Sequence, residues 1–156
     1  MQASDSEDAI VEQLELSAPP ERVFRALTDP RELAAWWGDS RMYVCDRWNL
    51  DLRVGGRWRA TGHSARGGTF AVEGEFLEID APRTLVYTWK PDWIEVPSTT
   101  IRIVLEAIPV GTRLTWTQRG FAGYPKALAD QRGGLPSVLA WLRGFVEHSE
   151  TVGSRR

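Results

Sequence analysis

The feature that most constrains the fold is a series of short segments between residues 57 and 118 in which apolar and polar residues alternate. Alternation at a period of two is typical of a strand that buries one face. Turn residues separate these segments, for example at residues 63–68 and 109–112. Because strands joined by short turns pair as hairpins, the pattern predicts an antiparallel meander with one face to be covered.

A C-terminal helix is the expected cover for that face. Pro136 suits the first turn of this helix. An earlier helical turn is expected to be interrupted at Gly133 and Gly134, before this helix begins. The helix is predicted to end near His148. Its broad apolar stripe is formed by Leu135, Val138, Leu139, Leu142, Phe145 and Val146.

Ahead of the meander, the pattern predicts a strand over residues 10–16 and then two short helices. Asp29 can cap the second helix, because Pro30 suits its first position, and Gly38 is expected to end it. Residues 41–52 have a poorer pattern, from which we expect a strand with an irregular beginning. The expected class is therefore α+β, with about six or seven strands wrapped around the last helix.

The composition indicates one globular domain. The chain has 156 residues, of which 42% are hydrophobic and 26% charged, enough to bury a substantial core. We expect a flexible N-terminus at residues 1–9, a domain over residues 10–148, and a flexible tail at residues 149–156.

Charge and hydropathy narrow the range of partners and compartments. The net charge is −2 and the basic residues are scattered, which argues against a nucleic-acid partner. No run of 18 apolar residues is present, so we expect no membrane span. Cys45 is the single cysteine, so an internal disulfide is excluded and a reducing cytoplasm is the expected location.

The sequence offers little for catalysis or metal binding. Its two histidines, His63 and His148, are far apart with no other metal-ligand pattern, so we expect no metal and no cofactor. No nucleophile motif occurs. If Trp58 points inward, Arg59 and Glu73 point outward and can form ion pairs on the solvent face. No catalytic residue is predicted.

The eight tryptophans are the main compositional oddity. Such wide side chains either fill a large core or line a pocket, and the pattern allows both. If the gap between sheet and helix is open, it forms an apolar pocket with Gln118 as an orienting polar group. The loop over residues 91–97 is also apolar and is expected to cover part of the interior. The predicted ligand-binding residues are Trp37, Trp58, Phe70, Tyr87, Trp89, Trp93, Trp116, Gln118, Leu139 and Leu142.

Several motifs in order resemble a known family. They are Val-Phe-Arg-Ala-Leu-Thr-Asp-Pro at residues 23–30, Trp36 with Trp37, Asp-Leu-Arg-Val-Gly-Gly at residues 51–56, and Leu-Val-Tyr-Thr-Trp at residues 85–89. Over roughly residues 10–147 the chain resembles the activator-of-heat-shock-ATPase-like branch of the START/SRPBCC helix-grip superfamily. In that fold the sheet grips the last helix around a cavity. The chain departs from the family at residues 134–136, where Gly-Leu-Pro stands in place of the usual Gly-Trp.

Three functions follow from the residues and this resemblance. The first is noncatalytic binding of a small hydrophobic or aromatic molecule, such as a lipid or a polyketide-like compound, in the cavity. The second is a chaperone-linked interaction module, which the family name implies. The third is a cyclase- or hydrolase-like enzyme that uses the same cavity. The chain is expected to be a monomer or a homodimer.

Overall fold

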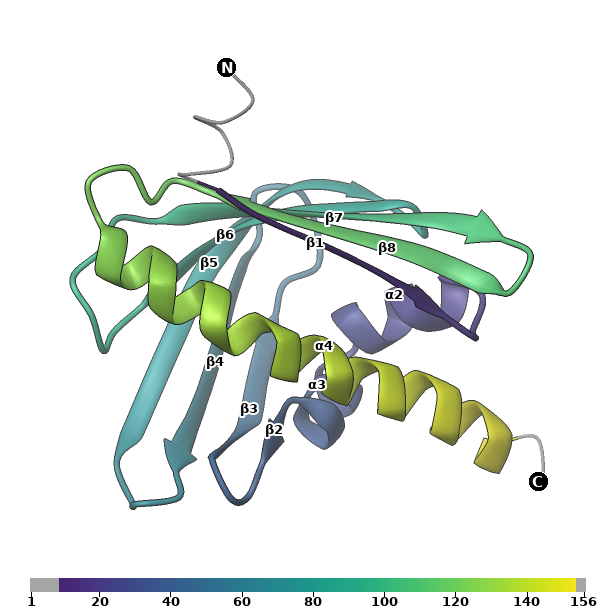
Figure 1. Cartoon of the computed structure of the whole chain (residues 1–156), viewed down its shortest axis with the longest axis horizontal. Coiled ribbons are helices and arrows are strands. Elements are labelled where there is room, and N and C mark those ends of the chain that lie inside the picture. Colours follow the sequence, from purple (N-terminus) through teal and green to yellow (C-terminus); the bar gives the residue numbers. More distant parts are fainter. Residues whose placement is uncertain (1–8, 154–156) are drawn as a thin grey trace.

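The computed structural model describes residues 9–153, and among them it forms eight strands and three helices (Figure 1). The chain begins with β1 (Ala9–Leu16), α2 (Pro20–Thr28) and α3 (Pro30–Trp36), and it ends with α4 (Pro125–Gly153). Between them lie β2 (Gly38–Asp39), β3 (Tyr43–Leu50), β4 (Arg57–Ser64), β5 (Thr69–Asp80), β6 (Thr84–Pro91), β7 (Thr99–Ile108) and β8 (Gly111–Arg119).

All described strands belong to one antiparallel sheet in the order β1-β8-β7-β6-β5-β4-β3-β2. Strands β2 to β8 form the predicted meander, and β1 adds to its far edge by pairing with β8. The α+β helix-grip prediction is confirmed. The structure has eight strands rather than six or seven, because a two-residue strand, β2, pairs with the start of β3.

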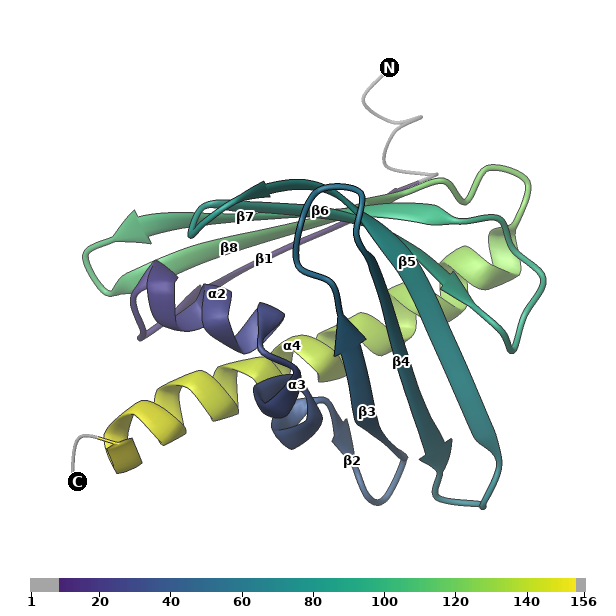
Figure 2. The ribbon, with the colours of Figure 1, turned by 180° about the vertical axis from the view of Figure 1, so that it is seen from behind.

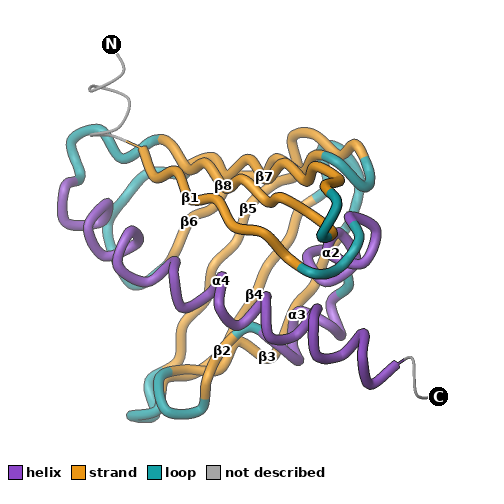
Figure 3. The backbone as a smooth tube through the Cα atoms, turned by 45° about the vertical axis from the view of Figure 1, so that its right-hand side comes forward, coloured by secondary structure: helices purple, strands orange, loops and turns teal. Residues whose placement is uncertain are grey.

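The sheet curls strongly, so that β7, β8 and β1 run almost across the direction of β3, β4 and β5 (Figures 1 and 2). Two irregularities in the strand register contribute to this bend. One lies between Val44 and Arg47 in β3, and the other between Phe76 and Glu78 in β5. Such bulges bend a strand and increase its twist. The result is a half-barrel whose concave side faces α4 (Figure 3).

The helix α4 differs from its prediction at both ends. It runs without interruption from Pro125 to Gly153, so the predicted break at Gly133 and Gly134 is wrong, as are the predicted starting turn at Pro136 and the end near His148. Packing explains the continuity, because buried apolar side chains hold α4 on both sides of these residues. They include Ala127, Leu128, Leu135, Val138, Leu142 and Val146. Tertiary contacts of this kind override weak helix propensity.

The two short helices form as their sequence predicts. Asp29 caps α3, because its Oδ1 accepts hydrogen bonds from the backbone N–H groups of Arg31 (2.8 Å) and Glu32 (3.4 Å). The indole of Trp36 donates to the carbonyl of Ala26 (2.9 Å), which ties α3 to α2. The helix ends at Trp36, and Gly38 adopts a positive φ of 129° as the chain enters β2.

The outer face of the sheet carries the ion pairs that strand parity predicts. Arg59 and Glu73 lie opposite each other on β4 and β5 and form a 3.1 Å ion pair. Both side chains are exposed, so this pair contributes little to stability. Trp58 and Ala60, which alternate with them, are buried on the inner face.

The predicted flexible ends and the expected absence of a membrane span can be compared with the structure only over the described residues. The predicted flexible segments fall partly on residues 1–8 and 154–156, which lie outside the described residues. Residues 149–153, predicted as tail, continue the backbone of α4. No helix within residues 9–153 combines the length and the apolar character that crossing a bilayer requires.

Candidate functional site

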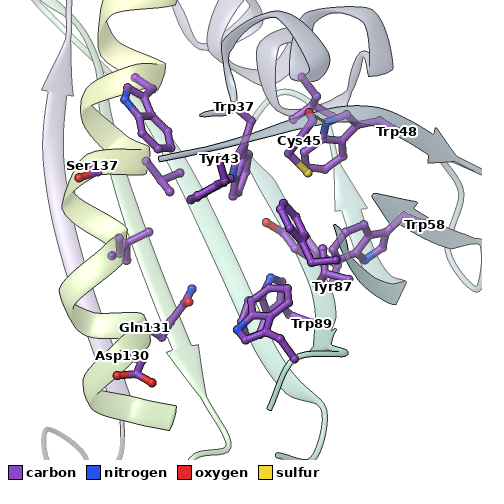
Figure 4. Close-up of a pocket in the computed structure, with 18 of the residues that line it drawn as sticks. Trp37, Tyr43, Cys45, Trp48, Trp58, Tyr87, Trp89, Asp130, Gln131 and Ser137 are labelled. Carbon is purple, nitrogen blue, oxygen red and sulfur yellow. Dashed lines mark hydrogen bonds between the residues drawn. The ribbon is translucent and has the colours of Figure 1, made fainter. Parts of the chain in front are cut away.

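A cavity of about 510 Å³ lies between the inner face of the sheet and the N-terminal half of α4 (Figure 4). This volume is within the usual range for small-molecule pockets, about 300 to 1,000 Å³. Aromatic side chains from the end of α3, from the strands and from the loop after β6 make up much of its wall. They are Trp37, Tyr43, Trp48, Trp58, Phe70, Phe76, Tyr87, Trp89, Trp93 and Trp116, and Trp141 joins them from α4.

Two indoles on the sheet side are held by hydrogen bonds to the backbone. Trp58 Nε1 donates to the carbonyl of Thr88 (3.1 Å), and Trp48 Nε1 donates to the carbonyl of Cys45 (2.7 Å). The two rings stack with centroids 6.1 Å apart and an interplanar angle of 16°. Because their polar ends are already bonded, these rings form a fixed wall rather than a mobile filling.

Tyr87 stands next to this wall on β6. Its ring packs edge to face against Trp58, with centroids 5.5 Å apart, and against Phe76 at 6.2 Å. Burial raises the pKa of the Tyr87 phenol well above its usual range, so the group is neutral at physiological pH. Within the described part of the chain, the hydroxyl makes no hydrogen bond, although every fully buried side-chain polar atom there has a partner. The hydroxyl therefore opens onto the cavity.

The opposite wall is one face of α4, to which Gly134 belongs. The residues that face the cavity recur at helical spacing, as the side chains in Figure 4 illustrate. Gly134 is exposed, and a methyl group built onto it would meet no atom within 4 Å, so a larger side chain at this position has open space to occupy. The α4 residues of this wall are Ala127, Asp130, Gln131, Gly134, Leu135, Ser137, Val138 and Trp141.

The open end of the cavity is marked by exposed apolar side chains, with Met42 51% and Trp93 55% exposed. A chain of edge-to-face ring contacts, each with centroids 5.5 to 5.6 Å apart, runs from Trp141 through Tyr43 and Phe70 to Trp93. It connects α4, β3, β5 and the loop after β6. Within residues 9–153, no hydrogen bond ties any of these four rings to the backbone.

A buried polar network lies behind the cavity wall. Gln118 is fully buried, and its Oε1 accepts from Trp116 Nε1 (3.4 Å) and from Gln131 Nε2 (3.1 Å). Its Nε2 donates to Thr99 Oγ1 (2.9 Å), which in turn donates to the carbonyl of Trp89 (3.3 Å). The network joins α4 to β8, β7 and β6 and fixes the backbone beside the cavity.

The structure brings most of the predicted binding residues together around this cavity. Seven of the ten belong to its wall: Trp37, Trp58, Phe70, Tyr87, Trp89, Trp93 and Trp116. The other three, Gln118, Leu139 and Leu142, are buried outside the wall. For Gln118 the reason is the network just described. Leu139 and Leu142 lie on a face of α4 that packs into the core and does not line the cavity. The binding role of all ten stays a prediction.

Sequence reasoning missed several wall residues. Trp48 and Tyr43 lie on β3, whose irregular pattern concealed which residues point inward. Trp141 and Gly134 lie on α4, where the apolar stripe drew attention to the leucines instead. The recurrence of Gly134, Val138 and Trp141 at spacings of four and three was the available signal.

The cavity wall offers little acid–base chemistry. Burial, helped by the charge of Asp46, raises the pKa of the Cys45 thiol to about 12, and burial also raises the pKa of Tyr43, partly opposed by a hydrogen bond with the Trp37 side chain. Asp130 is exposed and pairs with Lys126 at 3.2 Å. Within residues 9–153 no three His, Cys, Asp or Glu side chains are placed to hold a metal ion.

A curled antiparallel sheet that grips a long C-terminal helix around a cavity defines a helix-grip protein. Residues 17–147 match the family described as Activator of Hsp90 ATPase homolog 1-like protein, and the chain belongs to this family. The predicted family is thereby confirmed. A comparison with curated proteins gives no significant match.

Solved structures of other proteins share this fold. A crystal structure of a Chromobacterium violaceum protein has 30% identity and a TM-score of 0.75, and the match covers 90% of this chain and 98% of that one. A Nitrosomonas europaea protein has 24% identity and a TM-score of 0.79, with coverage of 94% and 98%. The solution structure of an AHSA1-like protein from Aeromonas hydrophila has 23% identity and a TM-score of 0.74, with coverage of 91% and 94%.

Proposed function

We propose that this protein binds a small hydrophobic or aromatic molecule, noncatalytically, in the cavity between the sheet and α4. The observation that carries the proposal is an aromatic cavity of about 510 Å³, to whose wall Gly134 contributes a position without a side chain. A well-packed core leaves few voids larger than a water molecule. A cavity of this size is therefore better explained as a binding site than as a packing fault.

The apolar surface that a ligand buries in this cavity sets an upper limit on its binding free energy. Burial of about 300 Å² of apolar ligand surface contributes roughly 7 kcal/mol, from which the cost of association must be subtracted. Because Trp58 and Trp48 are already fixed by hydrogen bonds, little side-chain ordering adds to that cost. Because the full ~7 kcal/mol would correspond to a dissociation constant of about 10 μM, a rigid three-ring hydrocarbon such as fluorene should bind no more tightly than that.

The test is a titration with fluorene, followed by tryptophan fluorescence and calorimetry, on three proteins. Gly134→Leu places a side chain in the cavity. Gly133→Leu makes the same substitution one position earlier, where a methyl group also meets no atom within 4 Å but the residue is not part of the wall. Both changes should leave the fold intact, because neither glycine has a positive φ.

The proposal predicts saturable binding to the unsubstituted protein and to Gly133→Leu, and binding at least tenfold weaker to Gly134→Leu. Circular dichroism and urea denaturation should show that both variants are folded. If the folded Gly134→Leu protein binds fluorene as tightly as the control, the site lies elsewhere and the proposal is wrong.

The predicted location, oligomeric state and alternative functions accompany this proposal. The single cysteine, Cys45, is buried, which suits a protein that works in the reducing cytoplasm. A monomer or a homodimer stays the prediction for the oligomeric state, which sedimentation velocity measures. The chaperone-linked and enzymatic hypotheses stay predictions, since no described contact favours either over ligand binding.

A further inference from the structure

The cavity has no positive charge with which to meet an anionic ligand. Its described wall contains no lysine, arginine or histidine. Its ionisable members other than Asp130 are Tyr43, Cys45 and Tyr87, and burial raises the pKa of each, so that all three are neutral at pH 7. A carboxylate or phosphate carried into this space would lose water and gain no countercharge, which is a large penalty. The single wall carboxylate, Asp130, is exposed and already paired with Lys126.

Several hydrogen-bond donors of the cavity wall have no protein partner among the described residues, and two of them belong to Tyr87 and Trp89 on β6. Within the described chain, neither Tyr87 Oη nor Trp89 Nε1 takes part in a hydrogen bond, whereas the indoles of Trp48 and Trp58 both donate to backbone carbonyls. No polar atom of this kind is sealed away without a partner. Both donors are therefore reachable from the cavity, to whose wall both residues belong.

These two donors are neighbours. Tyr87 and Trp89 occupy alternate positions of β6, so their side chains leave the same face of the strand. Figure 4 shows both on the sheet side of the cavity, across from Gln131 and Asp130 on α4. A phenylalanine would fill the place of Tyr87 equally well by packing alone, so its hydroxyl is a feature that packing does not require.

The buried network determines which way the carboxamide group of Gln131 points. The indole of Trp116 can only donate, so the atom of Gln118 facing it must be the carboxamide oxygen. That oxygen also faces Gln131, which must therefore present its NH₂ group there. The carbonyl oxygen of Gln131 is then turned away from the network, and it takes part in no hydrogen bond within residues 9–153.

From these contacts we propose that the ligand is an uncharged aromatic molecule with a carbonyl-type oxygen that accepts hydrogen bonds from Tyr87 Oη and Trp89 Nε1. The inference rests on the proposed binding function and narrows its ligand class. A ligand that displaces water from these donors without replacing the hydrogen bonds loses affinity. A neutral ketone, quinone or ester satisfies both donors, and a hydrocarbon satisfies neither.

Three probes of one shape test this assignment: fluorene, 9-fluorenone, which adds one carbonyl oxygen, and fluorene-9-carboxylate, which adds a negative charge. Each is titrated at pH 7 into the unsubstituted protein, Tyr87→Phe, Trp89→Phe and the control Tyr124→Phe. Tyr124 is 40% exposed and is not part of the cavity wall. Tyr87→Phe removes only a hydroxyl that has no protein partner, so this variant should fold normally.

The measured quantity is the ratio of fluorenone affinity to fluorene affinity in each protein. Since one hydrogen bond is worth a modest amount, we expect this ratio to fall about two- to tenfold in Tyr87→Phe and in Trp89→Phe. It should not change in Tyr124→Phe. The carboxylate should bind the unsubstituted protein at least about tenfold more weakly than fluorene.

The outcomes separate this inference from the proposed function. If fluorene binds and Gly134→Leu blocks it, but the fluorenone ratio is the same in Tyr87→Phe and the unsubstituted protein, the ligand class is wrong and the binding function stands. Carboxylate binding as tight as that of fluorene would overturn the uncharged class in the same way. If none of the three probes binds, the binding function and this inference both fail.

Discussion

Gly74 lies directly opposite Trp58 in the β4–β5 pair, beneath the indole that donates to the carbonyl of Thr88. A methyl group on Gly74 would lie 2.5 Å from Trp58 Nε1 and would collide with the Thr88 carbonyl oxygen. The Trp58 wall of the cavity therefore requires a glycine at this position. Gly74→Ala should force Trp58 or β6 to move and should lower the free energy of unfolding by about 1–3 kcal/mol.

Urea denaturation followed by circular dichroism measures this loss. Gly144→Ala is the matched control, because this exposed glycine of α4 has no atom within 4 Å of an added methyl group. It should raise the unfolding free energy by roughly 0.5–1 kcal/mol through better helix propensity. Equal effects of the two substitutions would contradict the close approach of Gly74 to Trp58.

Pro136 lies inside α4 and is exposed. A proline in a helix interior removes one backbone hydrogen bond and crowds the preceding turn, at a cost of about 3 kcal/mol. Pro136→Ala should therefore raise the unfolding free energy, by about 1–3 kcal/mol after the greater freedom of the unfolded chain is counted. A chemical denaturation series would detect this rise. A loss of stability would show that α4 does not continue through this position.

Gln118 is fully buried and bonds to three neighbouring side chains. Gln118→Leu preserves much of the volume but leaves the donor of Trp116 and the NH₂ group of Gln131 without their acceptor. We expect a loss of about 1–3 kcal/mol in unfolding free energy, measured by thermal and urea unfolding. A substitution without effect would mean that water replaces the missing acceptor.

Alkaline pH should weaken the fold. Burial raises the pKa of Cys45 to about 12 and also raises the pKa values of Tyr43 and Tyr87 above their usual range. The folded state then retains protons that the unfolded state has released, so the unfolding free energy must fall as pH rises above about 9. Below that pH these groups are protonated in both states and cause no change.

Urea midpoints at intervals between pH 7 and pH 11 measure this dependence. Cys45→Ala removes one of the three groups, so its stability should decline less steeply with pH than that of the unsubstituted protein. Identical slopes for the two proteins would show that Cys45 does not retain its proton in the folded state.

Much of this fold is predictable because its signals are local. The alternation of Leu85, Tyr87 and Trp89 specifies which face of β6 points inward, and Asp29 followed by Pro30 specifies the start of α3. Both depend on neighbouring residues alone. The continuity of α4 through Gly133, Gly134 and Pro136 is not predictable in this way, because distant packing of Leu128 and Leu142 decides it.

The candidate site is predictable to a lesser degree. Aromatic residues on regular strands, such as Trp58 and Trp89, could be assigned to the cavity from parity. Gln118 could not, because its place behind the wall depends on partners from two other elements, Thr99 on β7 and Gln131 on α4. The place of Gly134 in the wall was also hidden, since a residue without a side chain adds nothing to an apolar pattern.

The most direct test of the central claim is a crystal structure of the protein with 2-bromofluorene, in which anomalous scattering locates the bromine atom. The proposed binding function predicts a bromine peak inside the cavity, between Tyr87 on the sheet and Gly134 on α4. The proposed function would be contradicted if the crystals held the probe elsewhere and the cavity showed no bromine peak. It would also be contradicted if tryptophan side chains had collapsed into the cavity and filled it.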